Sequence, residues 1–140
     1  VGQFDIDIVQ CPLNIFDRSL ITSGWLSRLS RKGIEVHVRS IFLQGLLLLP
    51  PEQRHYKFNK WNTLFSEYDN WLKETGYSSL EACLKFALSF TEIRNVIIGV
   101  DNASQLKEII ESSKGHFSNI PDTIISNDLK LINPLSWLDF

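Results

Sequence analysis

Two polar side chains in this sequence stand where a ligand could reach them. Gln10 closes the segment FDIDIVQ (4–10), and its primary amide could pair with another amide, such as a nicotinamide carboxamide. The alternative is a glutamine that bonds to neighbouring backbone. Arg39 interrupts a second apolar segment, and its planar guanidinium could stack on an aromatic ring or clamp an anion. Because an unpaired buried guanidinium is costly, the alternative for Arg39 is an ion pair with Glu35 or Asp5.

The segment IIGVDNASQLKEI (97–109) passes from an apolar run into a helical pattern within a few residues. A helix that begins there presents unpaired backbone N–H groups and the positive end of its dipole, which suit an anion such as a nucleotide phosphate. Asn102 and Gln105 have the spacing of an N-cap and the third helical residue. Taken alone, the segment favours the alternative interpretation, in which Asn102 only caps the helix.

Several other kinds of chemistry lack their motifs here. The sequence has no G-x-S-x-G, no H-E-x-x-H, no G-x-G-x-x-G and no G-x-x-x-x-G-K-[ST] phosphate loop. Cys11 and Cys83 are the only cysteines, which indicates neither a disulfide framework nor a zinc site. We expect two buried thiols in a reduced cytoplasm. We also expect His37 in the core or a second layer, and Asp5 and Asp7 at a solvated edge.

Strands must position these side chains, and three segments have strand patterns: 4–10, 34–42 and 95–100. In the first, Phe4, Ile6 and Ile8 alternate with acidic residues, which predicts a half-buried strand. The third, NVIIGV, is a short apolar run typical of a buried strand. Residues 50–59 are polar and led by two prolines, which predicts a surface loop.

Amphipathic helices are predicted between and after the strands. The segment 23–33 offers Ser23 as an N-cap and Gly33 as a C-terminal stop. Aromatic and leucine side chains at spacings of three and four over 61–72 predict a second helix, ended by Gly76. We expect this aromatic stripe to serve packing and not a cofactor.

The last two helices carry their own start signals. Ser78 and Glu81 have capping-box spacing at the beginning of a third helix. After Asn102, a fourth helix is expected to turn its apolar residues inward: Leu106, Ile109 and Ile110. The tail predicts a short turn or helix anchored by Trp137.

The order of elements is β-α-β-loop-α-α-β-α with a tail. Strands that alternate with helices predict right-handed crossovers and a parallel sheet, an α/β fold. Three parallel strands could form a flat layer, or they could be a section cut from a (β/α)₈ barrel. In such a barrel, ligand sites lie at the carboxyl ends of the strands, which are here 10–14, 39–44 and 100–105.

Composition limits the classes of function. The chain has 140 residues, a size typical of one domain, and a formal net charge of −2 with a pI near 5.9. This charge argues against a nucleic-acid or anionic-membrane binder. The longest apolar stretch, 41–49, is too short to span a bilayer, and no signal peptide opens the chain. Methionine is absent even at position 1, as expected for part of a longer product.

Three of these segments together resemble the aldo/keto reductase family: VQCPLNIFD, GIEVHVRSIFLQGLL and NVIIGVDNASQLKEI. Their order and spacing are similar to the last three β/α units of that family's barrel. The resemblance runs from near Phe4 to about Ser112, and the tail segment INPLSW is also similar to the family's C-terminal segment. Each motif alone is weak, but three in register over most of the chain form a specific pattern.

The resemblance implies a partial (β/α)₈ TIM barrel, with residues 1–140 as a single C-terminal half-barrel segment. The family transfers a hydride between NAD(P)H and a small carbonyl substrate without a metal. By resemblance, Gln10 matches the strand-six glutamine that hydrogen-bonds the nicotinamide carboxamide. Arg39 stands where an aromatic ring of the family usually stacks on the nicotinamide. A guanidinium plane can stack in the same way, so the partner expected for Arg39 is a cofactor ring.

The resemblance also implies binding residues for the rest of the dinucleotide. Ser40, Phe42 and Gln44 match the strand-seven loop beside the pyrophosphate. The residues that match the strand-eight turn and helix at the adenosine end are Asp101, Asn102, Gln105 and Glu108. Many members carry Lys and Arg where Gly99 and Gln105 stand here, so NAD(H) is expected to be at least as good a cofactor as NADP(H).

One departure bears on activity. The family's catalytic Asp, Tyr, Lys and His lie on its first four strands, which are not among the segments that this chain resembles. We therefore expect the cofactor-binding half of a reductase, inactive by itself, that self-associates or pairs with a missing half-barrel. The alternative is a non-catalytic binding or interaction module derived from that barrel.

Overall fold

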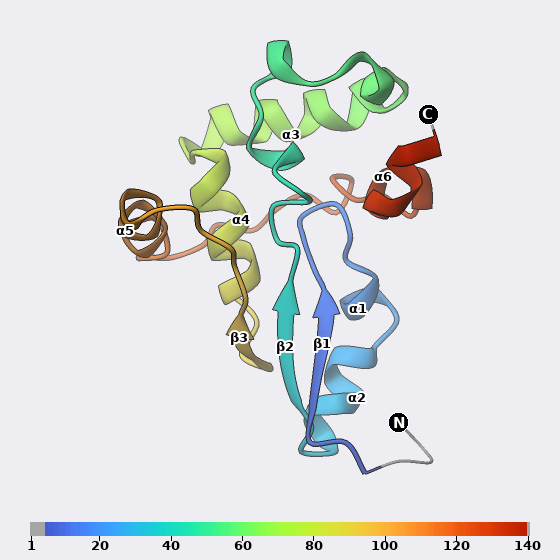
Figure 1. The fold of residues 1–140 in the computed structure, drawn as a ribbon, viewed down its shortest axis with the longest axis vertical. Coiled ribbons are helices and arrows are strands. Elements are labelled where there is room, and N and C mark those ends of the chain that lie inside the picture. Colours follow the sequence, from blue (N-terminus) through green and yellow to red (C-terminus); the bar gives the residue numbers. More distant parts are fainter. Residues whose placement is uncertain (1–4, 140) are drawn as a thin grey trace.

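The computed structural model describes residues 5–139 and contains one open sheet of three parallel strands (Figure 1). The strands are β1 (Ile8–Pro12), β2 (Glu35–Arg39) and β3 (Ile93–Val96), and their order in the sheet is β1-β2-β3. Helices flank the sheet, so the predicted α/β class is confirmed. The arrangement is consistent with a partial barrel. Within the described residues, no helix is long and apolar enough to cross a membrane.

The register aligns polar side chains across the sheet. Gln10 of β1 pairs with His37 of β2, and His37 pairs with Asn95 of β3. Pro12 pairs with Arg39 at the carboxyl ends of their strands. Paired residues of neighbouring strands point to the same face, so these residues share one face of the sheet.

All three strands differ from their predicted limits. β1 begins at Ile8, later than residue 4, and Phe4 lies outside the described residues. β2 ends at Arg39 because Ser40 adopts a positive φ of 61°, which turns the chain out of the sheet. β3 is Ile93–Val96, two residues earlier at its start than predicted. Residues 97–100 lie outside the strand, although the Ile97 N–H still donates to the Val38 carbonyl of β2 at 2.7 Å. Apolar character alone did not distinguish the strand from the residues that follow it.

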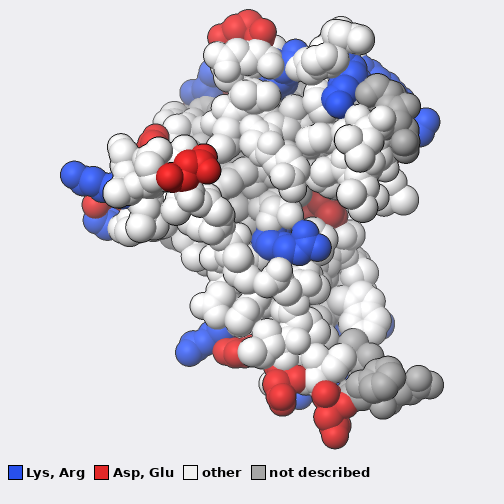
Figure 2. All heavy atoms as spheres, in the orientation of Figure 1, with Lys and Arg blue, Asp and Glu red and all other residues white. Residues whose placement is uncertain are grey.

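The two faces of the sheet have different environments. Val36 and Val38 are fully buried, while Glu35 and His37, which alternate with them along β2, are partly exposed and Arg39 is exposed. Helices α2 (Trp25–Arg31) and α4 (Ser79–Leu88) contact β2 and β3 respectively (Figure 1). The opposite face is open. Figure 2 shows that uncharged atoms cover most of this view and that acidic side chains gather near the amino ends of β1 and β2.

Much of the core lies beyond the carboxyl ends of the strands. There α3 (Asn62–Thr75) runs across the top of the molecule (Figure 1). Phe65, Tyr68 and Trp71 of α3 are buried, and Phe16 packs edge-on to Phe65 with 5.3 Å between ring centroids. The prediction that the aromatic stripe serves packing is therefore confirmed, as is the end of the helix at Gly76.

Helix starts were predicted with mixed success. The capping box of α4 is present: Ser78 accepts from the Glu81 N–H, and the Glu81 carboxylate accepts from the Ser78 N–H. Ser23 is not the N-cap of α2, because that position is Gly24 at φ 74°. A four-residue helix, α1 (Ser19–Thr22), precedes it and was not predicted. One helical turn is too short to show a periodic pattern.

Helix α5 (Ala103–Ser112) forms as predicted, but its apolar side chains are not all inward. Leu106 and Ile110 are exposed, and Ile109 is half-buried. Figure 1 shows α5 standing away from the sheet beside α4. The correction has a physical reason: the described residues provide no surface that covers this face.

The remaining segments are short. Three short 3₁₀ helices follow β2: η1 (Leu46–Leu48), η2 (Pro51–Gln53) and η3 (Tyr56–Trp61). The predicted loop 50–59 contains η2 and the start of η3. The tail forms α6 (Leu129–Ile132) and η4 (Pro134–Asp139), as the predicted short helix. Trp137 packs edge-on against Phe58 at 5.0 Å and donates its indole N–H to the Leu131 carbonyl, which confirms the anchor.

Candidate functional site

The chain leaves β2 through a loop with unusual backbone conformations. Ser40, Leu43 and Gln44 have positive φ values of 61°, 48° and 54°, and Gly45 follows at 83°. A positive φ is uncommon outside glycine and costs free energy, so several in one loop mark a candidate functional segment.

A buried asparagine ties this loop to the end of β1. Asn14 is 1% exposed, and its side-chain N–H donates to the Ser40 carbonyl at 3.4 Å. Its amide oxygen accepts from the N–H groups of Phe16 and Asp17 at 3.0 and 2.8 Å. Asn14 thus holds two strand-end loops together. Sequence reasoning assigned it no role, although a polar residue inside the apolar run LNIF was the available signal.

The strand ends enclose a cavity of about 430 Å³, here called the strand-end cavity. Its walls are residues of the loop after β2 and of the segment that follows β3: Arg39, Ser40, Ile41, Phe42, Gln44, Gly45, Ile97, Ile98 and Gly99. Four of the nine predicted site residues therefore line one cavity. Its volume lies in the range typical of ligand pockets.

Arg39 is exposed, not buried in the strand as the sequence suggested. Its Nη1 donates to Ser40 Oγ at 3.2 Å. The alternative of an ion pair with Glu35 is wrong, because Glu35 pairs with Arg94 at 3.3 Å and approaches His37 at 3.7 Å. No ion pair joins Arg39 to Asp5, which is exposed.

Gln10 lies outside the strand-end cavity, on the open face of the sheet. It is exposed and aligned with His37, whose Nε2 lies 2.9 Å from the side-chain nitrogen of Asn95. His37 is half-buried, in agreement with a second-layer histidine. Three strands thus present a polar row on this face. Asn95 was missed because it was taken only as the boundary of a strand.

The predicted adenosine-end residues gather at the start of α5. Asn102 caps the helix, because its side-chain oxygen accepts from the Gln105 N–H at 2.9 Å. The Gln105 side chain in turn accepts from the Asp101 N–H at 2.8 Å. Glu108 is exposed one turn along. Among residues 5–139, no acceptor bonds the N–H groups of Ala103 and Ser104. The predicted N-cap at Asn102 is therefore confirmed.

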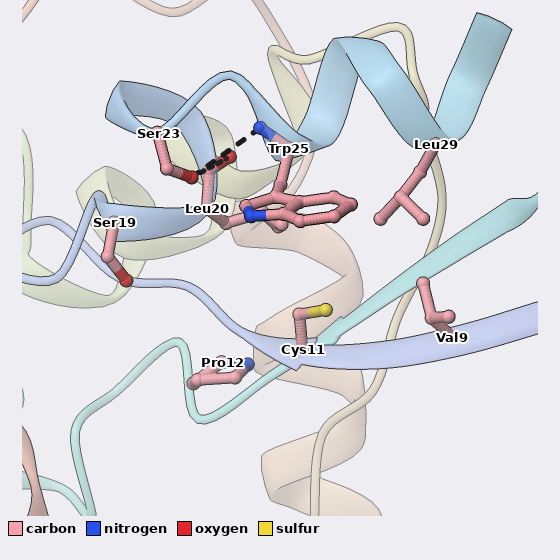
Figure 3. Close-up of a pocket in the computed structure, with 8 residues that line it drawn as sticks. All are labelled: Val9, Cys11, Pro12, Ser19, Leu20, Ser23, Trp25 and Leu29. Carbon is pink, nitrogen blue, oxygen red and sulfur yellow. Dashed lines mark hydrogen bonds between the residues drawn. The ribbon is translucent and has the colours of Figure 1, made fainter. Parts of the chain in front are cut away.

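A second concavity, the apolar groove, lies between β1 and helices α1 and α2 (Figure 3). Its volume is about 420 Å³, and its lining is Val9, Cys11, Pro12, Ser19, Leu20, Ser23, Trp25 and Leu29. Figure 3 shows the Trp25 ring above Cys11 and Val9 of the strand. None of the lining side chains is charged, so the groove offers packing surface and no evident chemistry.

Comparison with known proteins adds one match. The family model described as "Aldo/keto reductase family" matches residues 2–121. No curated protein matches the chain. The matched span includes β1, β2 and β3, the strand-end cavity and the whole of α5.

Proposed function

The chain belongs to the aldo/keto reductase family, and on this premise we propose that it binds a nicotinamide dinucleotide at the carboxyl ends of its strands. The proposed role is that of the cofactor-binding part of a carbonyl oxidoreductase. When bound, the dinucleotide would supply the hydride that reduces a small carbonyl compound. The residues of this chain would bind and orient it.

The observation that carries the proposal is the Arg39 guanidinium at the rim of the strand-end cavity. It is exposed, and its hydrogen bond to Ser40 Oγ restricts its orientation. A planar guanidinium stacks on aromatic rings, so Arg39 would stack on the nicotinamide. Gln10, on the neighbouring strand, would pair with the carboxamide.

The loop after β2 would hold the pyrophosphate. Ser40, Phe42 and Gln44 line the cavity, and the left-handed residues in this loop resemble backbone arrangements that form anion-binding concavities. Gly99 forms the opposite wall without a side chain, and a Cβ built there meets nothing within 4 Å. The cavity therefore has room for an extended ligand that passes between the two loops.

The start of α5 would bind the adenosine end. The unbonded N–H groups of Ala103 and Ser104 suit an anionic or hydroxyl oxygen. Asp101 would accept from a ribose hydroxyl, and Asn102, Gln105 and Glu108 would complete the surface. No basic residue lies in this turn, so we propose that NAD(H) serves at least as well as NADP(H).

A second candidate is a binding module without catalysis. It is favoured by the lining of the strand-end cavity, which contains no Asp, Tyr, Lys or His. A tyrosine hydroxyl can serve as a proton donor, but Tyr68 is buried and its hydroxyl donates to the Leu47 carbonyl. Hydride transfer to a carbonyl needs a proton donor, and a positioned acid contributes roughly 10²–10⁴-fold. Aldehyde reduction by the purified chain with either cofactor would refute this candidate.

Calorimetric titration of NADH tests the proposal directly. Arg39→Ala should weaken binding at least about tenfold, equal to about 1.4 kcal/mol. The matched control is Arg31→Ala, an exposed arginine on α2 that bonds only its own helix. Equal affinity of the Arg39→Ala protein and the control for NADH would refute the proposed role of Arg39.

A further inference from the structure

Arg18 is a buried arginine that the proposed cofactor site does not use. It is 8% exposed and lies just before α1. Its Nε donates to the Ile15 carbonyl at 3.0 Å, and its Nη2 donates to the carbonyls of Pro121 and Ile124 at 3.3 and 2.7 Å. These bonds fix the guanidinium between the loop after β1 and the segment after α5.

The fixed guanidinium lacks an anionic partner within hydrogen-bond distance. Among the described residues, no acceptor bonds Nη1, and the nearest carboxylate oxygen, of Asp122, is 3.9 Å away. The Asp122 side chain is fully exposed to solvent, so it screens the buried charge weakly. The guanidinium also lies over the Phe86 ring, 5.4 Å from the centroid. Burial lowers the pKa of Arg18, which reflects the cost of an incompletely paired charge.

Arg18 lines a cavity of about 590 Å³, here called the Arg18 cavity. It lies between α1, α4 and the segment 117–125, which Figure 1 shows in orange passing behind α4. Its apolar lining consists of three phenylalanines and three isoleucines: Phe86, Phe90, Phe117, Ile21, Ile120 and Ile125. Phe86 meets Phe90 and Phe117 edge-on at 5.3 and 6.0 Å, so aromatic edges and faces surround the space.

The polar groups of the cavity are few. Thr22, Ser89, Asn119 and Asp122 complete the lining, and Arg18 is its only cation. A single fixed guanidinium in apolar surroundings suits a monoanion. The carboxylate of Asp122 at the rim opposes a second negative charge. A phosphate or a dinucleotide therefore fits this cavity poorly.

We propose that the Arg18 cavity binds a small carboxylic acid with an aromatic body. The carboxylate would meet the two free N–H groups of Arg18 Nη1, and the ring would pack among the phenylalanines. The cavity shares no lining residue with the strand-end cavity, so the two sites are distinct in space. A ligand in the Arg18 cavity would contact α1, α4 and the segment 117–125.

Calorimetric titration of the 140-residue chain tests this site, with 3-phenylpropionate as the probe. The neutral 3-phenylpropanamide should bind at least about tenfold more weakly, because it lacks the charge that Arg18 requires. Acetate should bind more weakly as well, because it lacks the ring. Inorganic phosphate should not compete.

Two variants connect binding with these residues. Arg18→Gln should abolish binding of the probe, and its thermal melt shows whether the protein still folds. Asp122→Asn removes an exposed carboxylate that makes no hydrogen bond among the described residues, so it should leave folding intact and tighten binding about two- to fivefold. The charge-matched control is Glu52→Gln, which lies in η2 and outside the cavity.

Each result decides the inference. The inference is supported if Asp122→Asn binds the probe more tightly than Glu52→Gln does and the acid binds more tightly than the amide. This holds even if the Arg18→Gln protein does not fold. Absence of binding, equal affinity for acid and amide, or displacement by phosphate would overturn it. None of these results depends on NADH, so failure here leaves the proposed function unaffected.

Discussion

The two cysteine side chains show how surroundings decide the chemistry of a residue. Cys83 is buried, and its sulfur lies 3.8 Å from the Tyr68 hydroxyl. Burial raises the pKa of the Cys83 thiol to about 12. Cys11 was also expected to be buried, but it is partly exposed in the apolar groove (Figure 3). Burial raises the pKa of Cys11 as well, and the charge of Arg39 opposes that rise.

The thiols should therefore react at different rates. Because the thiolate is the nucleophile, the buried Cys83 thiol, whose pKa is raised, should resist iodoacetamide at pH 8, while the partly exposed Cys11 reacts first. Mass spectrometry of peptides from the time course measures both rates. The Cys11→Ser protein should stay unmodified until denaturant is added. Equal rates for the two thiols in the folded protein would contradict the described burial.

Replacement of Gln105 tests the cofactor preference at one residue. Gln105→Arg should improve NADPH binding by about 1–2 kcal/mol relative to NADH binding, because only NADPH carries a 2′-phosphate. The control is Lys107→Ala. Lys107 lies two residues after Gln105 on the helix and points roughly 200° away from it, so loss of the lysine should not weaken NADPH binding. Calorimetry with both cofactors measures these effects. A tenfold preference of the unsubstituted protein for NADPH would contradict the assignment.

At the scale of elements, local signals predicted best where one side chain satisfies the backbone. The spacing of Ser78 and Glu81 was sufficient to predict a capping box, because both hydrogen bonds are local. The start of α2 was not predictable in this way, since Gly24 acts through its backbone conformation and has no side-chain signal. The strand limits depended on where pairing stops. β2 ends where Ser40 adopts a positive φ, and a serine in the sequence does not indicate that conformation.

The capping box also predicts a pH dependence of stability. The pKa of Glu81 lies below its ordinary value of 4.5, chiefly because the carboxylate accepts a hydrogen bond from the Ser78 N–H. The Ser78 hydroxyl and Lys85 lower this pKa by smaller amounts. A lowered folded-state pKa stabilises the fold above the unfolded pKa, and this contribution is lost as pH falls through the folded value.

Urea denaturation of the Glu81→Gln protein measures that contribution. At pH 7 the substitution should reduce the free energy of unfolding by less than about 1 kcal/mol, because the carboxylate is largely solvated. The difference from the unsubstituted protein should shrink below pH 4. Glu67→Gln, an exposed position on α3, is the control and should show no such trend. A difference that grows at low pH would contradict the assigned cap.

At the scale of the whole molecule, the sequence predicted three parallel strands in one sheet, but not which surfaces remain uncovered. Amphipathicity predicted that Leu106 and Ile110 face inward, yet they are exposed. Periodicity shows that a helix has an apolar face and not whether another element meets it. The Arg18 cavity was equally inaccessible from sequence, because it joins segments more than one hundred residues apart.

The exposed apolar surfaces predict self-association of the chain. The uncovered face of α5, the apolar groove and the unpaired strand edges are surfaces that proteins usually cover. Light scattering should give a mass above that of a 16.1 kDa monomer. Leu106→Lys with Ile110→Lys should lower that mass, whereas Leu129→Lys, on the exposed side of α6, should not. A monodisperse monomer with a cooperative melt would contradict this expectation.

The most direct test of the central claim is hydrogen–deuterium exchange of the chain with and without saturating NADH. The claim is that the cofactor binds in the strand-end cavity, between the loop after β2 and the residues that follow β3, and extends to the start of α5. Backbone amides in peptides that cover 39–45 and 97–105 should exchange more slowly with NADH, while those of α3 should not change. Unchanged exchange in both segments, or protection confined to the Arg18 cavity, would contradict the account.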